Sequence, residues 1–341
     1  MIEIIKQRLN GSEYDFLRTN EHIKDTIMFL TLGGSYAYGT NIEGSDIDIR
    51  GCALNSKADL IGLSSIEQVI DTKTDTTIYS FNKFISLIIN CNPNTIEMLG
   101  CKPEHYLEIT PIGQELLDNK HLFLSKRAVH SFGGYANQQL RRLENALARD
   151  TYPQAEKERH ILNSVKCSMM TFESRFKEFE EGSINLYIDD SDQDDIDKEI
   201  FVDVNLRHYP LRDYKGMWSD MNTVVKEYAK LNGRNRKKDD AHLNKHAMHL
   251  IRLYLMCIDI LEKGEINTFR DKEHDLLMDI RNGKYQKEDG TFHREFFDMV
   301  DDYEKRVNYA IEHTNLPEKP DEKKIEEFVI SVNERVVTGD Y

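Results

Sequence analysis

Two aspartates separated by one residue, Asp46 and Asp48, are the clearest candidates for chemistry in the sequence. They lie in an alternating segment, Asp46-Ile47-Asp48-Ile49, which predicts a strand running to about Leu54. Residues i and i+2 of a strand point to the same face, so the two carboxylates would lie side by side and repel each other. A divalent cation would relieve that repulsion, and carboxylate oxygens suit Mg²⁺ or Mn²⁺. The pair therefore predicts a metal site.

A glycine–serine turn, Gly33-Gly34-Ser35, follows the apolar run Ile27-Met28-Phe29-Leu30. Glycines at the end of a strand let the backbone approach a ligand closely, and the exposed N–H groups of such a turn can hold phosphate oxygens. Ser35 adds a hydroxyl donor. The turn therefore predicts phosphate binding next to the metal.

A site that holds two metal ions usually needs a third carboxylate. Asp75 is the best placed, because it opens the predicted strand that continues through Thr76-Thr77-Ile78-Tyr79. Asp71 and Glu97 are the alternatives, and Asp75 also suits an ordinary turn between two strands. A metal beside a phosphate-binding turn is what phosphoryl and nucleotidyl transfer require, since catalysis there consists mainly of positioning and charge neutralisation.

The elements expected to position these residues form an α+β protein. Residues 1–124 read as a small mixed-sheet α/β domain. A helix is expected at 12–25, strands at 26–32, 66–71 and 75–81, and a buried helix at 83–90. Residues 125–341 read as a larger all-helical domain, with helices near 125–149, 240–263, 272–282, 293–315 and 321–337. The acidic stretch near 183–215 interrupts this pattern, and we interpret it as a loop-like insertion or flap.

Composition narrows the class of protein. The 341 residues carry a formal net charge of −15, which argues against broad electrostatic binding to DNA, RNA or an anionic membrane. No apolar run approaches the roughly 20 residues that span a bilayer, and the N-terminus lacks the order of a signal peptide. The five cysteines are scattered, as expected of reduced thiols in a cytoplasmic protein.

Several motifs together resemble the DNA polymerase β-like nucleotidyltransferase superfamily. Gly34-Ser35, ten further residues and Asp46-x-Asp48 are similar to its signature. One branch, which comprises bacterial and phage nucleotidyltransferases, some associated with RNA ligases, is similar over more of the chain, roughly residues 27–290. Its matching segments here are Gly34–Thr40, Ser45–Gly51, Lys83-Phe84, Asn92–Leu99, Lys245–Arg252 and Ile280–Gly283.

The resemblance implies roles for individual residues. Gly34 and Ser35 would bind a nucleoside triphosphate such as ATP, and Asp46, Asp48 and Asp75 would ligate Mg²⁺ or Mn²⁺. Tyr38 would contact the nucleotide or else pack against the sheet. Lys245, His249 and Arg252 fall on one helix face and would neutralise phosphates, although such a face is also commonly just solvated.

These expectations describe a metal-dependent enzyme that transfers an NMP from an NTP to an acceptor hydroxyl and releases pyrophosphate. The acceptor stays open between an RNA end, a protein and a small molecule, and no membrane partner is expected. The alternative is a catalytically inactive nucleotide-binding or toxin/antitoxin-type module with the same fold.

Overall fold

The computed structural model describes residues 2–151, 184–190, 198–212, 214–216, 218–219, 221–222, 226, 240–288 and 290–341. The chain forms two compact units. One comprises Met1–Arg141 together with Asn244–Tyr341, and the other comprises Arg142–Leu243. The first unit contains the sheet and most of the described helices, and every candidate site residue lies in it.

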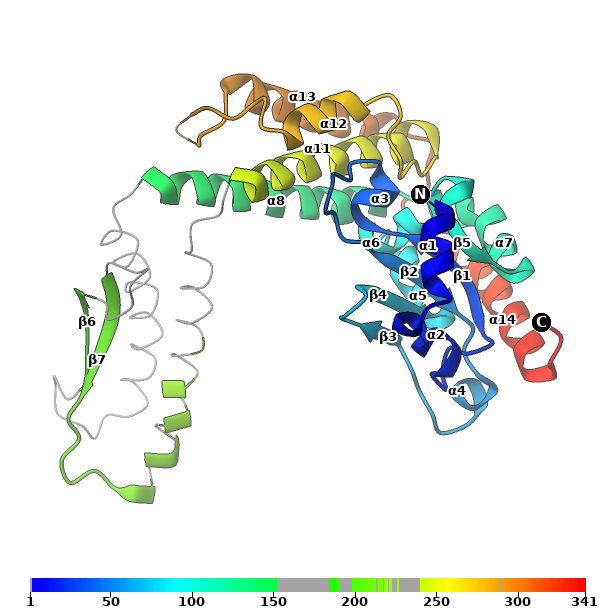
Figure 1. The fold of residues 1–341 in the computed structure, drawn as a ribbon, viewed down its shortest axis with the longest axis horizontal. Coiled ribbons are helices and arrows are strands. Elements are labelled where there is room, and N and C mark those ends of the chain that lie inside the picture. Colours follow the sequence, from blue (N-terminus) through cyan, green and yellow to red (C-terminus); the bar gives the residue numbers. More distant parts are fainter. Residues whose placement is uncertain are drawn as a thin grey trace. The chain divides into compact units, whose positions relative to one another are not determined.

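Five strands form a mixed sheet in the first unit, in the order β3-β4-β2-β1-β5 (Figure 1). The strands are β1 (Ile27–Leu32), β2 (Ile49–Ala53), β3 (Gln68–Asp71), β4 (Thr76–Ser80) and β5 (Tyr106–Ile109). β2 and β4 are parallel, whereas the other neighbouring pairs are antiparallel. The strands expected at 26–32, 66–71 and 75–81 correspond to β1, β3 and β4.

The strand expected to contain Asp46 and Asp48 begins later than predicted. β2 starts at Ile49, and both aspartates lie in the preceding loop. The loop is held by a turn in which the Ser45 hydroxyl accepts a hydrogen bond from the backbone N–H of Ile42. Aspartate is unfavourable in strands and favourable in such loops. The argument that the two carboxylates share one face of a strand was therefore wrong.

Short N-terminal helices cover one face of the sheet. They are α1 (Ile2–Leu9), the 3-10 helix η1 (Ser12–Tyr14) and α2 (Phe16–Thr19). Side chains from this segment, including Tyr14 and Leu17, pack with Leu30 and Ile78 of the sheet. The single helix expected at 12–25 is thus broken, because the Asn20 side chain accepts the N–H of His22 and ends α2.

Other helices pack on the opposite face. They are α5 (Phe81–Ile89), α6 (Pro93–Ile96), η2 (Glu97–Gly100), η3 (Pro103–His105), α7 (Pro111–Asp118), η4 (Lys120–Phe123) and the C-terminal α14 (Glu322–Thr338). Phe84 of α5 meets Phe29 of β1 edge to face, and Phe81 meets Phe328 of α14 in the same way. α14 therefore belongs to the packing of the α/β region. Two short helices, α3 (Gly34–Tyr38) and α4 (Lys57–Ile61), follow β1 and β2.

The remaining helices are α8 (Arg127–Thr151), α11 (Asp240–Lys263), α12 (His274–Arg281) and α13 (Arg294–His313). α11 is buried over nearly its whole circumference between Leu250 and Leu261, which is typical of a helix at the centre of a larger core. Its N-terminal part contacts α8, where His246 Nδ1 lies 2.9 Å from Gln139 Oε1.

The second unit contains a feature that the sequence interpretation missed. Strands β6 (Ile184–Asp190) and β7 (Lys198–Val204) form an antiparallel hairpin within the acidic stretch that was expected to be loop-like. Each segment has a short run of apolar and aromatic residues, Leu186-Tyr187-Ile188 and Ile200-Phe201-Val202, and such residues favour strands despite the acidic composition. Composition alone was a misleading guide here.

The α+β class is confirmed: a mixed sheet lies in the N-terminal part and a mostly helical region follows it. The domain boundary expected after residue 124 stays a prediction. Among the described residues, no helix is long and apolar enough to cross a membrane.

Candidate active site

The strand register gathers three segments at one end of the sheet. Leu32 at the end of β1 pairs with Ile49 at the start of β2, and Ile49 pairs with Thr76 at the start of β4. The residues next to these ends continue the pairing, because Gly33 N–H donates to the carbonyl of Asp48 (2.9 Å) and Ile49 N–H to that of Asp75 (3.2 Å). The glycine turn, Asp48 and Asp75 are thereby neighbours.

Gly34 lies directly against the carboxylate of Asp48. Its φ of 54° is in the left-handed region, and a Cβ atom at this position would overlap the Asp48 carboxylate. Only glycine allows both the backbone conformation and the close approach. Ser35 follows as the second residue of α3 and is partly exposed.

The side chain of Arg50 bridges the two carboxylates. Its Nη2 lies 3.2 Å from Asp48 Oδ1 and 3.1 Å from Asp75 Oδ1. Its Nη1 donates to the backbone carbonyls of Asp75 and Ile49. Such a fork of donors holds planar acceptors in a fixed orientation. Arg50 therefore holds Asp75 beside Asp48, although Asp75 sits on a turn with a φ of 44°.

The two carboxyls share a hydrogen bond, with opposite effects on their acidity. Burial and the hydrogen bond with Asp75 raise the pKa of Asp48 to about 7, against the opposing charge of Arg50. The hydrogen bond from Asp48, together with Arg50, lowers the pKa of Asp75. Two adjacent carboxyls repel each other when both are ionised, and the charge of Arg50 offsets this repulsion only in part.

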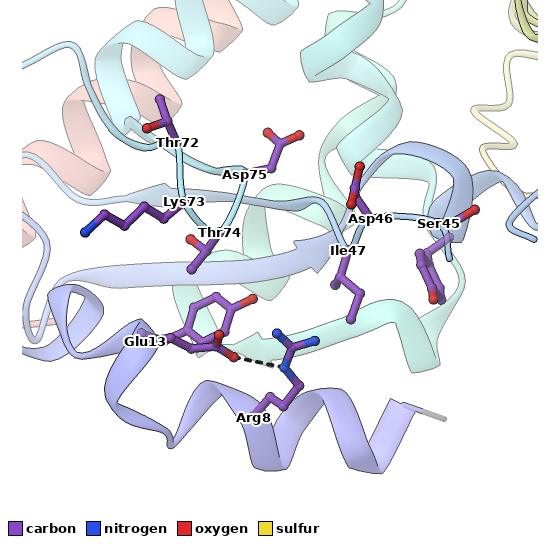
Figure 2. A pocket seen from close by; sticks show the side chains of 11 residues that line it. Arg8, Glu13, Ser45, Asp46, Ile47, Thr72, Lys73, Thr74 and Asp75 are labelled. Carbon is purple, nitrogen blue, oxygen red and sulfur yellow. Dashed lines mark hydrogen bonds and ion pairs between the residues drawn. The ribbon is translucent and has the colours of Figure 1, made fainter. Parts of the chain in front are cut away.

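Asp46 is exposed and lines a pocket of about 580 Å³ that Asp75 also lines. In Figure 2 the carboxylates of Asp46 and Asp75 lie on one edge of this pocket, and Arg8 lies on the opposite edge. The remaining lining residues are Glu13, Tyr14, Tyr36, Ser45, Ile47, Thr72, Lys73 and Thr74. Asp46 and Asp75 thus line the same pocket, whereas Asp46 does not share a strand face with Asp48.

Lys245 contributes from α11. It is exposed, and its positive charge acts on Asp48, where it lowers the pKa of that carboxyl against the larger opposing effects. The helix face predicted from the sequence therefore acts on Asp48 electrostatically through this lysine.

Arg252, which lies on the same predicted face, is buried with only 1% of its side chain exposed. Its Nη1 lies 3.0 Å from Glu97 Oε2, and its guanidinium lies 3.5 Å from the centre of the Tyr38 ring. Tyr38 in turn donates its hydroxyl to Glu97 Oε1 at 2.7 Å, and burial raises the pKa of Tyr38 so that this proton is kept. The expectation that Arg252 presents itself to solvent-borne phosphates was wrong, because its charge is neutralised inside the core.

His249 lies between this buried cluster and the surface. It is partly exposed, its Nδ1 is 3.3 Å from Arg252 Nη2, and its ring is 6.3 Å from the Tyr38 ring. The two alternatives for the third carboxylate have other partners: Glu97 belongs to the buried cluster, and Asp71 accepts hydrogen bonds from the N–H and hydroxyl of Thr74.

Residues 2–164 match the family described as the RNA repair pathway DNA polymerase beta family. Over this segment the chain resembles the polymerase β-like nucleotidyltransferases. No curated protein and no solved structure matches the chain.

A divalent metal is the cofactor that a polymerase β-like fold implies, and the chain offers part of a site for it. Among the described residues, no group of three or more His, Cys, Asp or Glu side chains is gathered closely enough to hold a metal ion. Asp48 and Asp75 nevertheless form a pair of hard oxygen donors, with the exposed Asp46 nearby. The donor chemistry fits Mg²⁺ or Mn²⁺, because such a cation can replace both the shared proton and the compensation from Arg50.

No role in this candidate site was predicted for Arg50 from the sequence. The signal was present, because Arg50 is a cation only two residues after Asp48, and its side chain contacts that carboxylate. A metal ion was the expected cation beside the two carboxylates, but the chain supplies a cation of its own in Arg50.

Proposed function

We propose that the protein is a metal-dependent nucleotidyltransferase that transfers an NMP from an NTP to an acceptor hydroxyl and releases pyrophosphate. The observation that carries this proposal is the grouping of Asp48, Asp75 and Arg50 against the close backbone approach of Gly34. A non-catalytic module would have no need to keep paired carboxylates at this position, since their repulsion is unfavourable.

On the donor side, the backbone of Gly34 and the hydroxyl of Ser35 would hold the triphosphate. Lys245, whose charge already reaches Asp48, would neutralise phosphate oxygens from α11. His249 would contact the nucleotide from the same helix. Tyr38 and Arg252 would act from within the core by holding α3 and α11 together.

On the acceptor side, Asp75 would accept a hydrogen bond from the attacking hydroxyl. That oxygen would form a bond to the α-phosphorus as the bond to the bridging oxygen of pyrophosphate breaks, and the hydroxyl proton would leave to a carboxylate or to water. Mg²⁺ or Mn²⁺, held by Asp46, Asp48 and Asp75, would supply neutralisation of the charge that develops on the phosphates.

For the class of acceptor we propose an RNA end. The support is the description of the matching family, which names an RNA repair pathway. The acidic net charge of −15 favours recognition of a short end over recognition of a long duplex.

The test is the double substitution Asp46→Asn with Asp48→Asn. Each change keeps the side-chain size and removes a charge, so we expect Mg²⁺-dependent transfer of label from an α-labelled NTP to fall to background while the thermal unfolding temperature is kept. Asp275→Asn, an exposed aspartate on α12, is the matched control and should keep full activity. Wild-type transfer by the double variant would refute the assignment of the carboxylates.

Calorimetry separates this proposal from the inactive module. Each NTP is tested for binding and for Mg²⁺-dependent pyrophosphate release, with a cell extract as the source of acceptor. Binding without pyrophosphate release by the wild-type protein would favour a nucleotide-binding module.

A further inference from the structure

We propose that the pocket beside Asp46 and Asp75 is the acceptor subsite, and that it takes a hydroxylated, phosphate-bearing end of nucleotide size. This inference rests on the proposed function, because it assigns a place and a chemistry to the acceptor of that reaction. The ligand is either a free nucleotide or the terminal nucleotide of an RNA strand, which share this chemistry.

The position of the pocket is the first argument. Four segments enclose it: the N-terminal helices with Arg8 and Tyr14, α3 with Tyr36, the loop at 45–47 and the turn at 72–75 (Figure 2). Asp46 and Asp75 line it, whereas none of Gly33, Gly34 and Ser35 does. Tyr36 of α3 also lines it, so the pocket adjoins the carboxylates without including the glycine turn. This leaves the pocket open to an acceptor if the donor phosphates occupy that turn.

Charge is the second argument. Arg8 lies across the pocket from Asp46 and Asp75 in Figure 2. Its Nε already forms an ion pair with Glu13 Oε1 at 2.9 Å. Lys73 is exposed at the tip of the 72–75 turn, and within the described part of the chain it forms no ion pair. A ligand with a hydroxyl at the carboxylate edge and an anionic group near Lys73 would match this distribution.

The polarity and size of the pocket are the third argument. The hydroxyl-bearing residues Tyr36, Ser45 and Thr72 line it, and Ile47 is the single aliphatic lining residue. Such a wall suits a sugar better than an apolar side chain. A volume of about 580 Å³ lies in the usual range for a small-molecule site, which suits one nucleotide but not several.

The experiment measures binding and transfer separately. The binding probe is a fluorescein-labelled single-stranded RNA of twelve nucleotides with a free 3′ hydroxyl, followed by anisotropy without NTP, with unlabelled 5′-AMP as competitor. Transfer of label from an α-labelled NTP to the same RNA is then followed with Mg²⁺.

We expect Lys73→Glu to weaken RNA binding and to raise the KM for RNA about tenfold or more, with the NTP affinity unchanged. Lys73→Ala should reduce the slope of log affinity against log salt by about 0.7, the value for one phosphate contact on a single strand. A lysine with only a structural role would not change this slope. Lys57→Glu, an exposed lysine beyond the other end of β2, makes the same charge change and should behave as wild type.

Three outcomes would overturn the inference: RNA and 5′-AMP binding unaffected by Lys73→Glu, equal weakening of NTP and RNA, or label appearing only on protein. If 5′-AMP competes as strongly as unlabelled RNA, the ligand of the subsite is a free nucleotide. If it competes much more weakly, the ligand is the end of an RNA strand. If no NTP supports pyrophosphate release, the proposed function fails, and RNA binding that depends on Lys73 still shows the pocket to be a nucleotide site.

Discussion

At the scale of single residues, the site depends on the close approach of the Asp48 carboxylate to the backbone of Gly34, which a side chain at residue 34 would prevent. The carboxylate of Asp48 fills the space where a Cβ of residue 34 would stand. Arg50 then fixes that carboxylate to Asp75 through two contacts of 3.1–3.2 Å. The geometry of the carboxylates is therefore set by a glycine on one side and an arginine on the other.

Gly34→Ala tests the close approach. The added methyl must displace the Asp48 carboxylate, and since a shift of about 1 Å in a catalytic group can cost roughly a hundredfold in rate, we expect kcat/KM for transfer to fall by about that factor. The measurement is steady-state transfer alongside thermal unfolding.

Gly44→Ala is the matched control, because Gly44 also has a left-handed φ, 81°, but has open space where the methyl would stand. Both variants carry the backbone strain of about 1–2 kcal/mol, and only the first carries the clash. Equal activity of the two variants would show that contact with Asp48 does not matter.

At the scale of elements, three pieces of secondary structure meet at a buried charge. Tyr38 ends α3, Glu97 opens η2, and Arg252 lies in the middle of α11. The Thr268 hydroxyl, from the loop after α11, donates to the backbone carbonyl of Glu97 and adds a further tie. The helix that begins at the glycine turn is thereby anchored to the helix that carries Lys245 and His249.

Glu97→Ala tests this anchor. Removing one partner leaves Arg252 buried and unpaired, so we expect a loss of about 3–5 kcal/mol in the free energy of unfolding, measured by urea denaturation. The double variant Glu97→Leu with Arg252→Met should lose less than the sum of its single variants, because no lone charge remains.

The surface pair Lys305–Asp302, with both side chains at least 75% exposed, provides the control. Asp302→Ala should change stability by less than about 1 kcal/mol. A loss from Glu97→Ala no greater than from Asp302→Ala would mean that the buried pair does not hold these elements together.

At the scale of the whole molecule, the unit that contains the site is built from two separate stretches of chain. Residues up to Arg141 and from Asn244 onward form it together. The stretches meet at Gln139 and His246, whose side chains are 2.9 Å apart, so the chain leaves this unit and returns to it at nearly the same place. Insertions with adjacent ends are the kind that a host unit tolerates.

Replacing residues 142–243 with a short glycine–serine linker tests this organisation. Since α14 packs on the α/β region through Phe328 and α11 joins it through Arg252 and Glu97, we expect the shortened protein to fold cooperatively and to bind NTP. Circular dichroism, thermal unfolding and calorimetry would check this. A molten or insoluble product would mean that the removed segment belongs to the folding unit.

Much of the site was foreseeable from local pattern. The glycine–serine turn, the Asp-x-Asp spacing and the strand from Thr76 each follow from rules that act over a few residues, and so do the long helices. The exact start of β2 was not foreseeable from alternation, because a polar loop residue and an outward strand residue look alike in sequence.

The sequence by itself thus determined the resemblance to polymerase β-like nucleotidyltransferases and the choice of candidate carboxylates. Only the tertiary structure decided which groups meet. It placed Arg50 between Asp48 and Asp75, and it buried Arg252 against Glu97 and Tyr38. The physical reason is that strand register and burial depend on contacts between residues far apart in the chain. Helical spacing puts Lys245 and Arg252 on one face, but the core that packs against that face decides which of the two charges remains free for a ligand.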